Sequence, residues 1–284
     1  MPSFKHLITF IGVRTLYLFF ELLPVHAASD VGGWLGRTLG PFFPASKAAR
    51  KNLKRILPER AAEHEAIIRG MWDNLGRIFA EYPHLKAIAE SRGGARVDLV
   101  GRKNLEAFKD MGRGGLMVGG HTANWEFGSR FMAELGVPTH VVYRPPNNPL
   151  VDRLLAGARA GAISSIGKGS EGARKIIRIL KNKEFVAMLI DQKMNDGISI
   201  PFMGVPAMTA AAAAQIAMRH QVPICVMRCE RIKGVHFRWT VLPPFIPPVD
   251  GDEVEIMTRI NDQLSAWVRE RPDQWLWIHH RWGK

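Results

Sequence analysis

From residue 97 onward, short apolar runs alternate with amphipathic segments of helical length. Strands that alternate with helices in this way are typical of βαβ units. We therefore predict an α/β fold with a largely parallel central sheet flanked by helices. The apolar runs expected to form strands are VDLVG (97–101), GLMVGG (115–120), THVVYR (139–144), FVAMLID (185–191), PICVMRCE (223–230) and FRWTVLPP (237–244).

The segments before and after this alternating region have helical periodicity. Residues 45–92 are predicted to be helical, with Ser46 as a candidate cap of the segment SKAARKNLKRIL. A last helix is expected over residues 252–271. Its apolar residues recur at helical spacing and form one packing face, namely Val254, Met257, Ile260, Leu264 and Val268.

The N-terminal stretch from Leu7 to Leu23 is strongly apolar but is interrupted by Arg14 and Glu21. A secretory signal peptide is disfavoured because the run is long and carries charges. A buried core helix remains an alternative. The favoured interpretation is a membrane anchor that either spans the bilayer or lies in its interface. We accordingly divide the chain into an anchor or interfacial helix at 1–44 and a second domain at 45–284.

Charge and cysteine content narrow the partners and the compartment. The chain has 284 residues and a formal net charge of +13, which favours an anionic partner such as an acidic membrane surface, an acidic substrate or an acidic carrier. Its two cysteines, Cys225 and Cys229, lie too far apart along one predicted strand for a disulfide. Two unbridged thiols suit a reducing compartment.

Polar side chains follow several of the predicted strands. In an open parallel sheet, ligands bind beyond the carboxyl ends of the strands. The residues at those ends are therefore candidates for a site, and they are His121, Arg144, Asp191, Gln192 and Arg228.

His121 and Glu126 frame the segment HTANWE that follows the second strand. They are about 140° apart on a regular helix, so they meet only if His121 lies in a loop and Glu126 in the first helical turn. A carboxylate on one imidazole nitrogen would stabilise the imidazolium that forms when the other nitrogen takes a proton. The segment has no adjacent Ser or Cys, so the hydroxyl that is deprotonated would belong to the substrate.

Several segments, taken in order, resemble the late acyltransferases of lipid A biosynthesis, within the lysophospholipid acyltransferase superfamily. GGHTANWE (119–126) resembles the His-x4-acidic motif, with an Asn-Trp inside it that is similar to the lauroyl and myristoyl transferases. The resemblance extends over essentially the whole chain. The other matching segments are VYRPPNNPLVDRLL (142–155), LIDQ (189–192), IPFMGVPAMT (200–209) and PDQWLWIHHRW (272–282).

This resemblance implies that an acyl chain passes from an acyl-acyl carrier protein thioester to a hydroxyl of a lipid A precursor. His121 would be the general base and Glu126 would orient it. No cofactor or metal is expected. The enzyme would lie at the inner (cytoplasmic) membrane, with its catalytic domain on the cytoplasmic face. The candidate substrate-binding residues are Asn124, Arg144, Asp191, Gln192, Gly204, Arg228 and Lys168.

Three alternatives remain open. The enzyme could acylate another membrane glycolipid or phospholipid. The segment GKGSEG (Gly167–Gly172) matches G-x-G-x-x-G and precedes a helix, as in a nucleotide-dependent oxidoreductase. Nucleic-acid binding by the basic surface is disfavoured, because no helix-turn-helix, zinc-finger or RNA-binding signature accompanies the charge.

Overall fold

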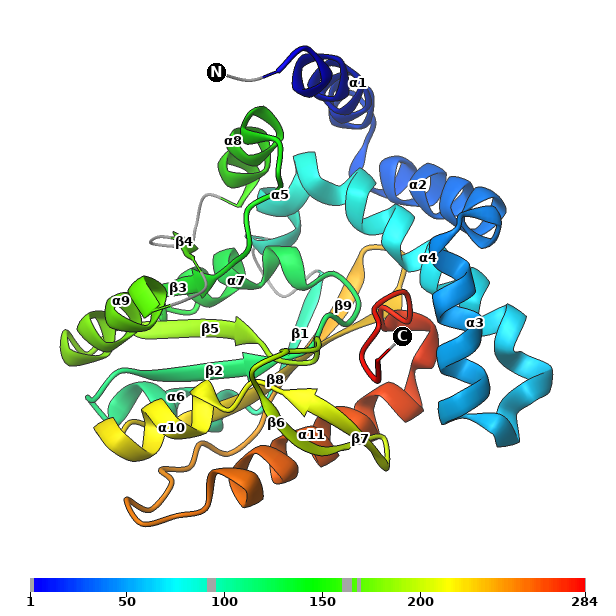
Figure 1. Cartoon of the computed structure of the whole chain (residues 1–284). Helices are drawn as coiled ribbons and strands as arrows, with labels where there is room; N and C mark the ends of the chain where they lie inside the picture. The colour runs from blue at the N-terminus through cyan, green and yellow to red at the C-terminus, as the bar shows by residue number, and fades with distance from the viewer. Residues whose placement is uncertain (1–2, 91–95, 160–164, 168–169, 284) are drawn as a thin grey trace.

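A mostly parallel sheet lies at the centre of the computed structural model, which describes residues 3–90, 96–159, 165–167 and 170–283 (Figure 1). Within these residues the strand order is β1-β9-β8-β2-β5-β3-β4, and β6 and β7 form a separate hairpin. The strands are β1 (Val97–Val100), β2 (Gly115–Gly119), β3 (Thr139–Val142), β4 (Ser165–Ile166), β5 (Phe185–Leu189), β6 (Ile198–Phe202), β7 (Val205–Thr209), β8 (Ile224–Lys233) and β9 (His236–Val241).

The strand directions confirm the predicted α/β architecture. The pairs β1–β9, β2–β8, β2–β5, β3–β5 and β3–β4 are parallel, and β8 pairs antiparallel with β9. Each of the six predicted apolar runs contains a strand. The β6–β7 hairpin and the two-residue β4 were not predicted, because a proline-containing hairpin and a very short edge strand show no sustained alternation.

Helices precede the sheet in the sequence, and others cover both of its faces. The α-helices are α1 (Phe4–Glu21), α2 (Val25–Leu39), α3 (Ala45–Ile56), α4 (His64–Glu81), α5 (Leu85–Ala89), α6 (Arg102–Asp110), α7 (Gly128–Glu134), α8 (Pro149–Ala158), α9 (Ser170–Lys181), α10 (Ala212–His220) and α11 (Glu253–Glu270). The short 3₁₀ turns are η1 (Gly40–Phe42), η2 (Pro58–Glu63), η3 (Tyr82–His84), η4 (Trp125–Phe127) and η5 (Pro272–Gln274). The helix predicted at the C-terminal end is confirmed as α11.

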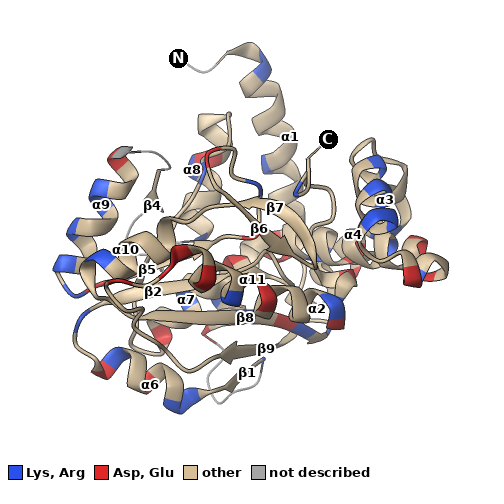
Figure 2. Cartoon of the chain, turned by 60° about the horizontal axis from the view of Figure 1, so that its bottom comes forward, with Lys and Arg blue, Asp and Glu red and all other residues tan. Residues whose placement is uncertain are grey.

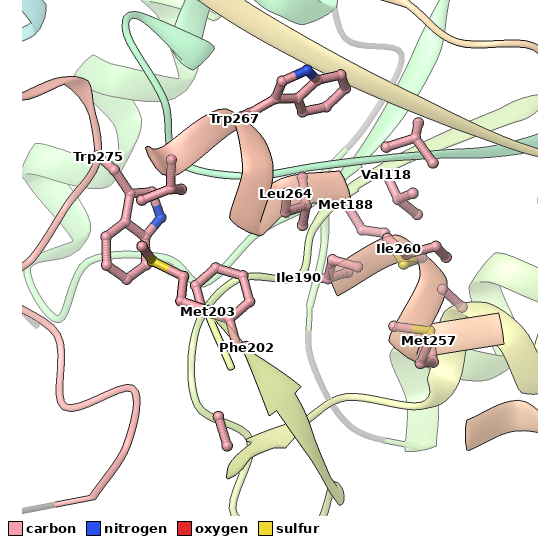
Figure 3. Packing of buried hydrophobic residues seen from close by; sticks show 14 of the residues in the cluster. Val118, Met188, Ile190, Phe202, Met203, Met257, Ile260, Leu264, Trp267 and Trp275 are labelled. Atoms are coloured by element: carbon pink, nitrogen blue, oxygen red, sulfur yellow. The ribbon is translucent and has the colours of Figure 1, made fainter. Parts of the chain in front are cut away.

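Alternate residues of β2 enter two different cores. Leu116 and Val118 pack with residues of α9, α10 and α11, whereas Met117 packs with residues of α5, α6 and α7. Figure 3 shows Val118 in the first of these cores, near Ile260 and Leu264 of α11. The central strands are therefore covered on both faces, which leaves their carboxyl ends as the place for a site.

Glycines bring α2 against α4. A Cβ atom on Gly32 would lie 2.5 Å from the carbonyl oxygen of Gly76, and one on Gly36 would lie 2.0 Å from the carbonyl oxygen of Trp72. The two backbones can approach this closely only because no side chain intervenes. Residues 25–39 are thus fixed to α4, and the division of the chain at residue 44 stays a prediction.

Helix α1 has one face toward the protein and one toward the outside. Phe20 is buried and Val13 and Tyr17 are half-buried, and the helix contacts α8 and η3. On an ideal helix, all but one of the exposed large apolar residues lie within an arc of about 120°. They are Phe4, Leu7, Ile8, Ile11, Leu18, Phe19 and Leu22, with Leu16 outside the arc. No helix in the described ranges has the length and apolarity required to cross a bilayer.

Two local predictions have different outcomes. Ser46 does not cap α3, because the helix begins at Ala45 and the Ser46 hydroxyl is buried, donating to the Gly40 carbonyl and accepting from the Trp72 indole. Cys225 and Cys229 are free thiols on β8, as expected. Burial raises the pKa of each thiol to about 12, so both are poor nucleophiles.

Candidate active site

A cavity of about 600 Å³ lies at the carboxyl ends of β2, β3 and β5. Its volume is within the range of about 300 to 1,000 Å³ that is usual for small-molecule sites. Most of its wall is apolar, with contributions from the sheet and from α4, α7 and α8. The apolar lining includes Leu75, Phe79, Met117, Val118, Met132, Val141, Val142, Ala156, Ala187, Met188, Leu189, Met227, Trp239, Leu276 and Ile278.

His121 faces this cavity from the loop after β2, and a buried carboxylate holds its imidazole. Nδ1 of His121 lies 2.6 Å from Oδ1 of Asp191, and the His121 backbone N–H donates to Oδ2 at 2.7 Å. Asp191 is only 2% exposed. Because β2 and β5 are neighbours with Gly119 opposite Leu189, the residues that follow the two strands meet.

The indole of Trp275 completes the environment of Asp191, donating from Nε1 to Oδ2 at 2.7 Å. Burial alone would raise the pKa of this carboxyl. The charge of His121, its hydrogen bonds and the Trp275 indole outweigh burial and lower the pKa to about 2. Asp191 is therefore a carboxylate at neutral pH, so the neutral form of His121 has its proton on Nδ1 and a lone pair on Nε2.

The lowered pKa makes folding stability depend on pH in acid. The folded pKa of about 2 lies below the ordinary value of 3.8, so the stabilisation is present above pH 4 and is lost as the pH falls toward 2. We expect wild type to lose about 1 kcal/mol more unfolding free energy than Asp191→Asn between pH 5 and pH 3. Denaturant titration of both proteins at each pH measures this difference. Parallel losses in the two proteins would contradict it.

Glu126 contacts Arg159 rather than His121, which corrects the expectation that the two ends of HTANWE meet. The Arg159 guanidinium donates to both Glu126 carboxylate oxygens, at 2.5 and 2.9 Å, and to the Tyr82 hydroxyl at 2.7 Å. Gly119 and Gly120 do bend the chain, but the bend points the imidazole at β5. Burial opposes the charge of Arg159, yet the Glu126 carboxylate raises its pKa, so this ion pair persists at the cavity wall.

Asn124 is turned away from the cavity, contrary to its expected role as a substrate contact. Its side chain is fully buried, its amide donates to Oε2 of Glu81 at 2.7 Å, and its carbonyl accepts from the backbone N–H of Glu126. Glu81 in turn forms a two-point ion pair with Arg231, at 2.6 and 3.0 Å. Asn124 therefore fixes the loop that carries His121.

Gln192 and Arg144 line the cavity, as expected. Nε2 of Gln192 lies 3.2 Å from Nε2 of His121 and 3.1 Å from Nε2 of His279. Burial and the nearby charge of His121 lower the pKa of His279, so its imidazole is neutral at neutral pH. Arg144 is exposed at the start of the chain between β3 and α8.

Two further expected contacts, Arg228 and Gly204, are not brought to the cavity. Strand β8 continues past Arg228 to Lys233, because it pairs with β9 beyond the parallel part of the sheet, and Arg228 forms ion pairs with Glu270 and Glu230. Gly204 forms the exposed turn of the β6–β7 hairpin, with φ of +82°, where glycine is favoured. Lys168 lies outside the described residues.

The glycine segment Gly167–Gly172 occupies the wrong place for a dinucleotide site. In that class of fold, the glycine loop follows a central strand beside the point where strand order reverses. Here it follows β4, the edge strand of the sheet. Residues 168 and 169 lie outside the described part, and the position of β4 alone argues against the oxidoreductase alternative.

The fold brings three residues to the site that were not among the predicted site residues. Arg159 follows α8, and Trp275 and His279 belong to the C-terminal segment, whose bridge between Trp275 and Thr122 sets it beside the His121 loop. Trp275 belongs to the first of the two cores. It is buried, and Figure 3 shows it beside Phe202 and Met203, but its indole also binds Asp191. The sequence feature that could have indicated Trp275 and His279 is the run of tryptophans and histidines within residues 275–282.

Comparison with known proteins identifies the family of this chain. The model of the bacterial lipid A biosynthesis acyltransferase family matches residues 1–284. A lipid A biosynthesis palmitoleoyltransferase of Escherichia coli (strain K12) is 26% identical over 98% of this chain and 91% of its own length. A lauroyltransferase of the same pathway and organism is 24% identical, over 98% and 92%. A phosphatidylinositol mannoside acyltransferase of Mycolicibacterium smegmatis is 21% identical, over 97% and 91%.

Proposed function

Because the chain belongs to the bacterial lipid A biosynthesis acyltransferase family, we propose that it transfers a fatty acyl chain from an acyl carrier protein thioester to a hydroxyl of a lipid A precursor. The observation that carries the chemistry is the pairing of His121 with buried Asp191 at the mouth of an apolar cavity. This pair can take a proton from an incoming hydroxyl, and the cavity can hold a hydrocarbon chain.

His121 is the proposed general base. Its Nδ1–H is held by Asp191, so the lone pair that accepts the proton of the acceptor hydroxyl is on Nε2. The imidazolium that forms is stabilised by the adjacent carboxylate. Glu126 takes a different role from the one first expected: it fixes Arg159 at the cavity wall, and through Arg159 it fixes Tyr82.

The basic excess suits both proposed substrates. A lipid A precursor carries phosphates, the carrier protein is acidic, and the net charge of +13 attracts such anions. Arg144 lies exposed at the cavity, where a phosphate or carboxylate of either substrate would meet a guanidinium.

We place the enzyme at the inner membrane, with α1 lying in the bilayer interface. The exposed apolar arc of α1 faces away from the protein, and α1 packs on α8, which contributes Ala156 to the cavity wall. A helix of this kind buries its apolar side at the boundary between headgroups and acyl chains. Figure 2 shows Lys and Arg along α3, and exposed Lys47, Lys51 and Lys54 would add attraction to anionic lipid.

A single charge on this arc should weaken membrane binding. Burying an isoleucine side chain contributes about 1.5 to 3 kcal/mol, so Ile8→Glu is expected to lower partitioning into anionic vesicles at least roughly tenfold. Vesicle flotation in high salt measures the effect. Thr9→Glu is the matched control, since Thr9 is exposed but lies outside the apolar arc. Equal binding of the two variants would contradict the interfacial position of α1.

Mass spectrometry of lipid A tests the function itself. Cells that lack this protein and cells that express it should differ by one acyl chain on lipid A, and His121→Ala should give the pattern of the lacking strain. A gain of acyl chain on another membrane glycolipid, with lipid A unchanged, would reassign the acceptor toward the chemistry of the phosphatidylinositol mannoside relative. No acyl difference in any lipid would reject the proposal.

A further inference from the structure

We propose that the side-chain amide of Gln192 is the donor that stabilises the oxyanion formed when the thioester carbonyl is attacked. The inference rests on the proposed acyl transfer and names a residue for a step that His121 and Asp191 do not perform. Its basis is the position of the Gln192 amide nitrogen, which lies between two imidazoles, 3.2 Å from Nε2 of His121 and 3.1 Å from Nε2 of His279.

The tautomer of His121 decides which way the amide faces. Asp191 is ionised and accepts from Nδ1, so neutral His121 has only a lone pair on Nε2. A group that sits at this lone pair must donate, so the NH₂ end of Gln192 and not its carbonyl faces His121. The NH₂ group has two hydrogens, one for each imidazole, and His279 is held neutral by its lowered pKa and can accept the second.

Binding of the acceptor releases one of these hydrogens. The acceptor hydroxyl must reach Nε2 of His121 to be deprotonated, and that position is the one to which Gln192 donates in the free enzyme. When the hydroxyl occupies this position at Nε2, Gln192 still donates to His279 and has one N–H without a partner. That N–H then lies within a few ångströms of the hydroxyl oxygen and so next to the carbonyl that this oxygen attacks.

Several other described donors near His121 are already committed. The backbone N–H groups of His121, Thr122 and Ala123 donate to Asp191, Gly120 and Gln274, respectively. The backbone N–H of Glu126 donates to Asn124, and the Trp125 indole and the Arg159 guanidinium both donate to Glu126. Gln192 differs from all of these because the reaction itself frees its hydrogen.

The step balances without any further reactant. The hydroxyl proton moves to Nε2 of His121 as the new C–O bond forms, and the carbonyl π pair moves to oxygen, where it accepts the N–H of Gln192. When the C=O bond re-forms, the C–S bond breaks, and the thiolate takes the proton from the His121 imidazolium. The ester and the free thiol leave, and His121 and Gln192 return to their starting states.

Steady-state kinetics of Gln192→Met tests the proposal. Methionine has the same length but no N–H, and loss of one oxyanion donor lowers kcat by a factor of about 100 to 1,000. We expect KM for donor and acceptor to change little. We also expect the acidic limb of the pH profile of kcat to stay at the same pH, because in the substrate complex Gln192 no longer donates to Nε2 of His121. Gln192→Glu, which keeps the shape, should lose kcat as well, and Lys193→Met, on the exposed neighbour, should retain it.

Any of three outcomes would overturn the proposal. One is a folded Gln192→Met enzyme with kcat within about threefold of wild type, and another is an effect confined to KM for the acceptor. A shift of the acidic limb of the pH profile of kcat would also contradict the proposal, since Gln192 would then act by positioning His121. If Gln192→Met does not fold, Gln192→Glu decides by the same kcat criterion. A wild-type enzyme that transfers no acyl group would instead reject the proposed function.

Discussion

Replacing His121 with alanine is expected to lower kcat by a factor of about 100 to 10,000, with the protein still folded, because general-base catalysis contributes about that much. The side chain is partly exposed at the cavity and its loss opens no core void. Asp191→Asn should be similarly damaging, since an amide has one acceptor oxygen where Asp191 uses two and has no charge to stabilise the imidazolium. In a Ser-His-Asp protease that replacement lowers kcat about 10,000-fold.

A comparison with Glu126→Gln separates the two carboxylates. Glutamine at 126 keeps one acceptor for Arg159 and leaves the His121–Asp191 pair intact, so it should cost less kcat than Asp191→Asn. Kinetics of the purified variants, with circular dichroism to verify folding, measure all three. A larger loss for Glu126→Gln than for Asp191→Asn would show that Glu126 is the partner of His121 in the working enzyme.

Arg231→Met is expected to lower the free energy of unfolding by about 3 to 5 kcal/mol, because it leaves the Glu81 carboxylate buried and unpaired. Glu81 is fully buried and accepts from Arg231, Ser29 and Asn124. Asn124 joins this pair to the His121 loop, so the loss of stability should be accompanied by a loss of activity. Denaturant unfolding followed by fluorescence measures the first effect.

An exposed ion pair supplies the control for this prediction. Arg50 and Glu65 are joined at 2.7 Å on the surface, with side chains 43% and 52% exposed. Arg50→Met should therefore change the unfolding free energy by less than about 1 kcal/mol. If Arg231→Met costs as little as Arg50→Met, the Glu81–Arg231 pair does not hold the loop in place.

The sequence predicted which residues form strands better than it predicted which strands lie side by side in the sheet. Periodicity located the run that ends at His121 and the run that ends at Asp191, and placed both residues at strand ends. It contained no information that β2 and β5 lie side by side, because crossover connections let strands distant in sequence become neighbours. Asp191, the carboxylate that contacts His121, was therefore among the candidates, but its pairing with His121 was not predicted.

Burial explains most of the other differences. An amide in a motif and an arginine on a strand look alike in sequence whether they face a ligand or a carboxylate of the protein. Asn124 faces Glu81, and Arg228 faces Glu270, so neither reaches the cavity. His279 and Trp275 come from a C-terminal segment with little regular structure, whose position follows from contacts with the His121 loop, with Asp191 and with Asn52 of α3.

The central claim is that the acceptor hydroxyl attacks the thioester directly, with His121 as base and no acyl-enzyme. Purified protein incubated with a labelled acyl-carrier thioester tests this most directly when the label is followed before and after a lipid A precursor is added. We predict no stoichiometric, denaturation-stable label on the protein alone, and transfer of the label to the lipid upon addition, at a rate that survives replacement of Cys225 and Cys229 by serine. A labelled acyl-protein that then passes its label to the lipid would contradict the account.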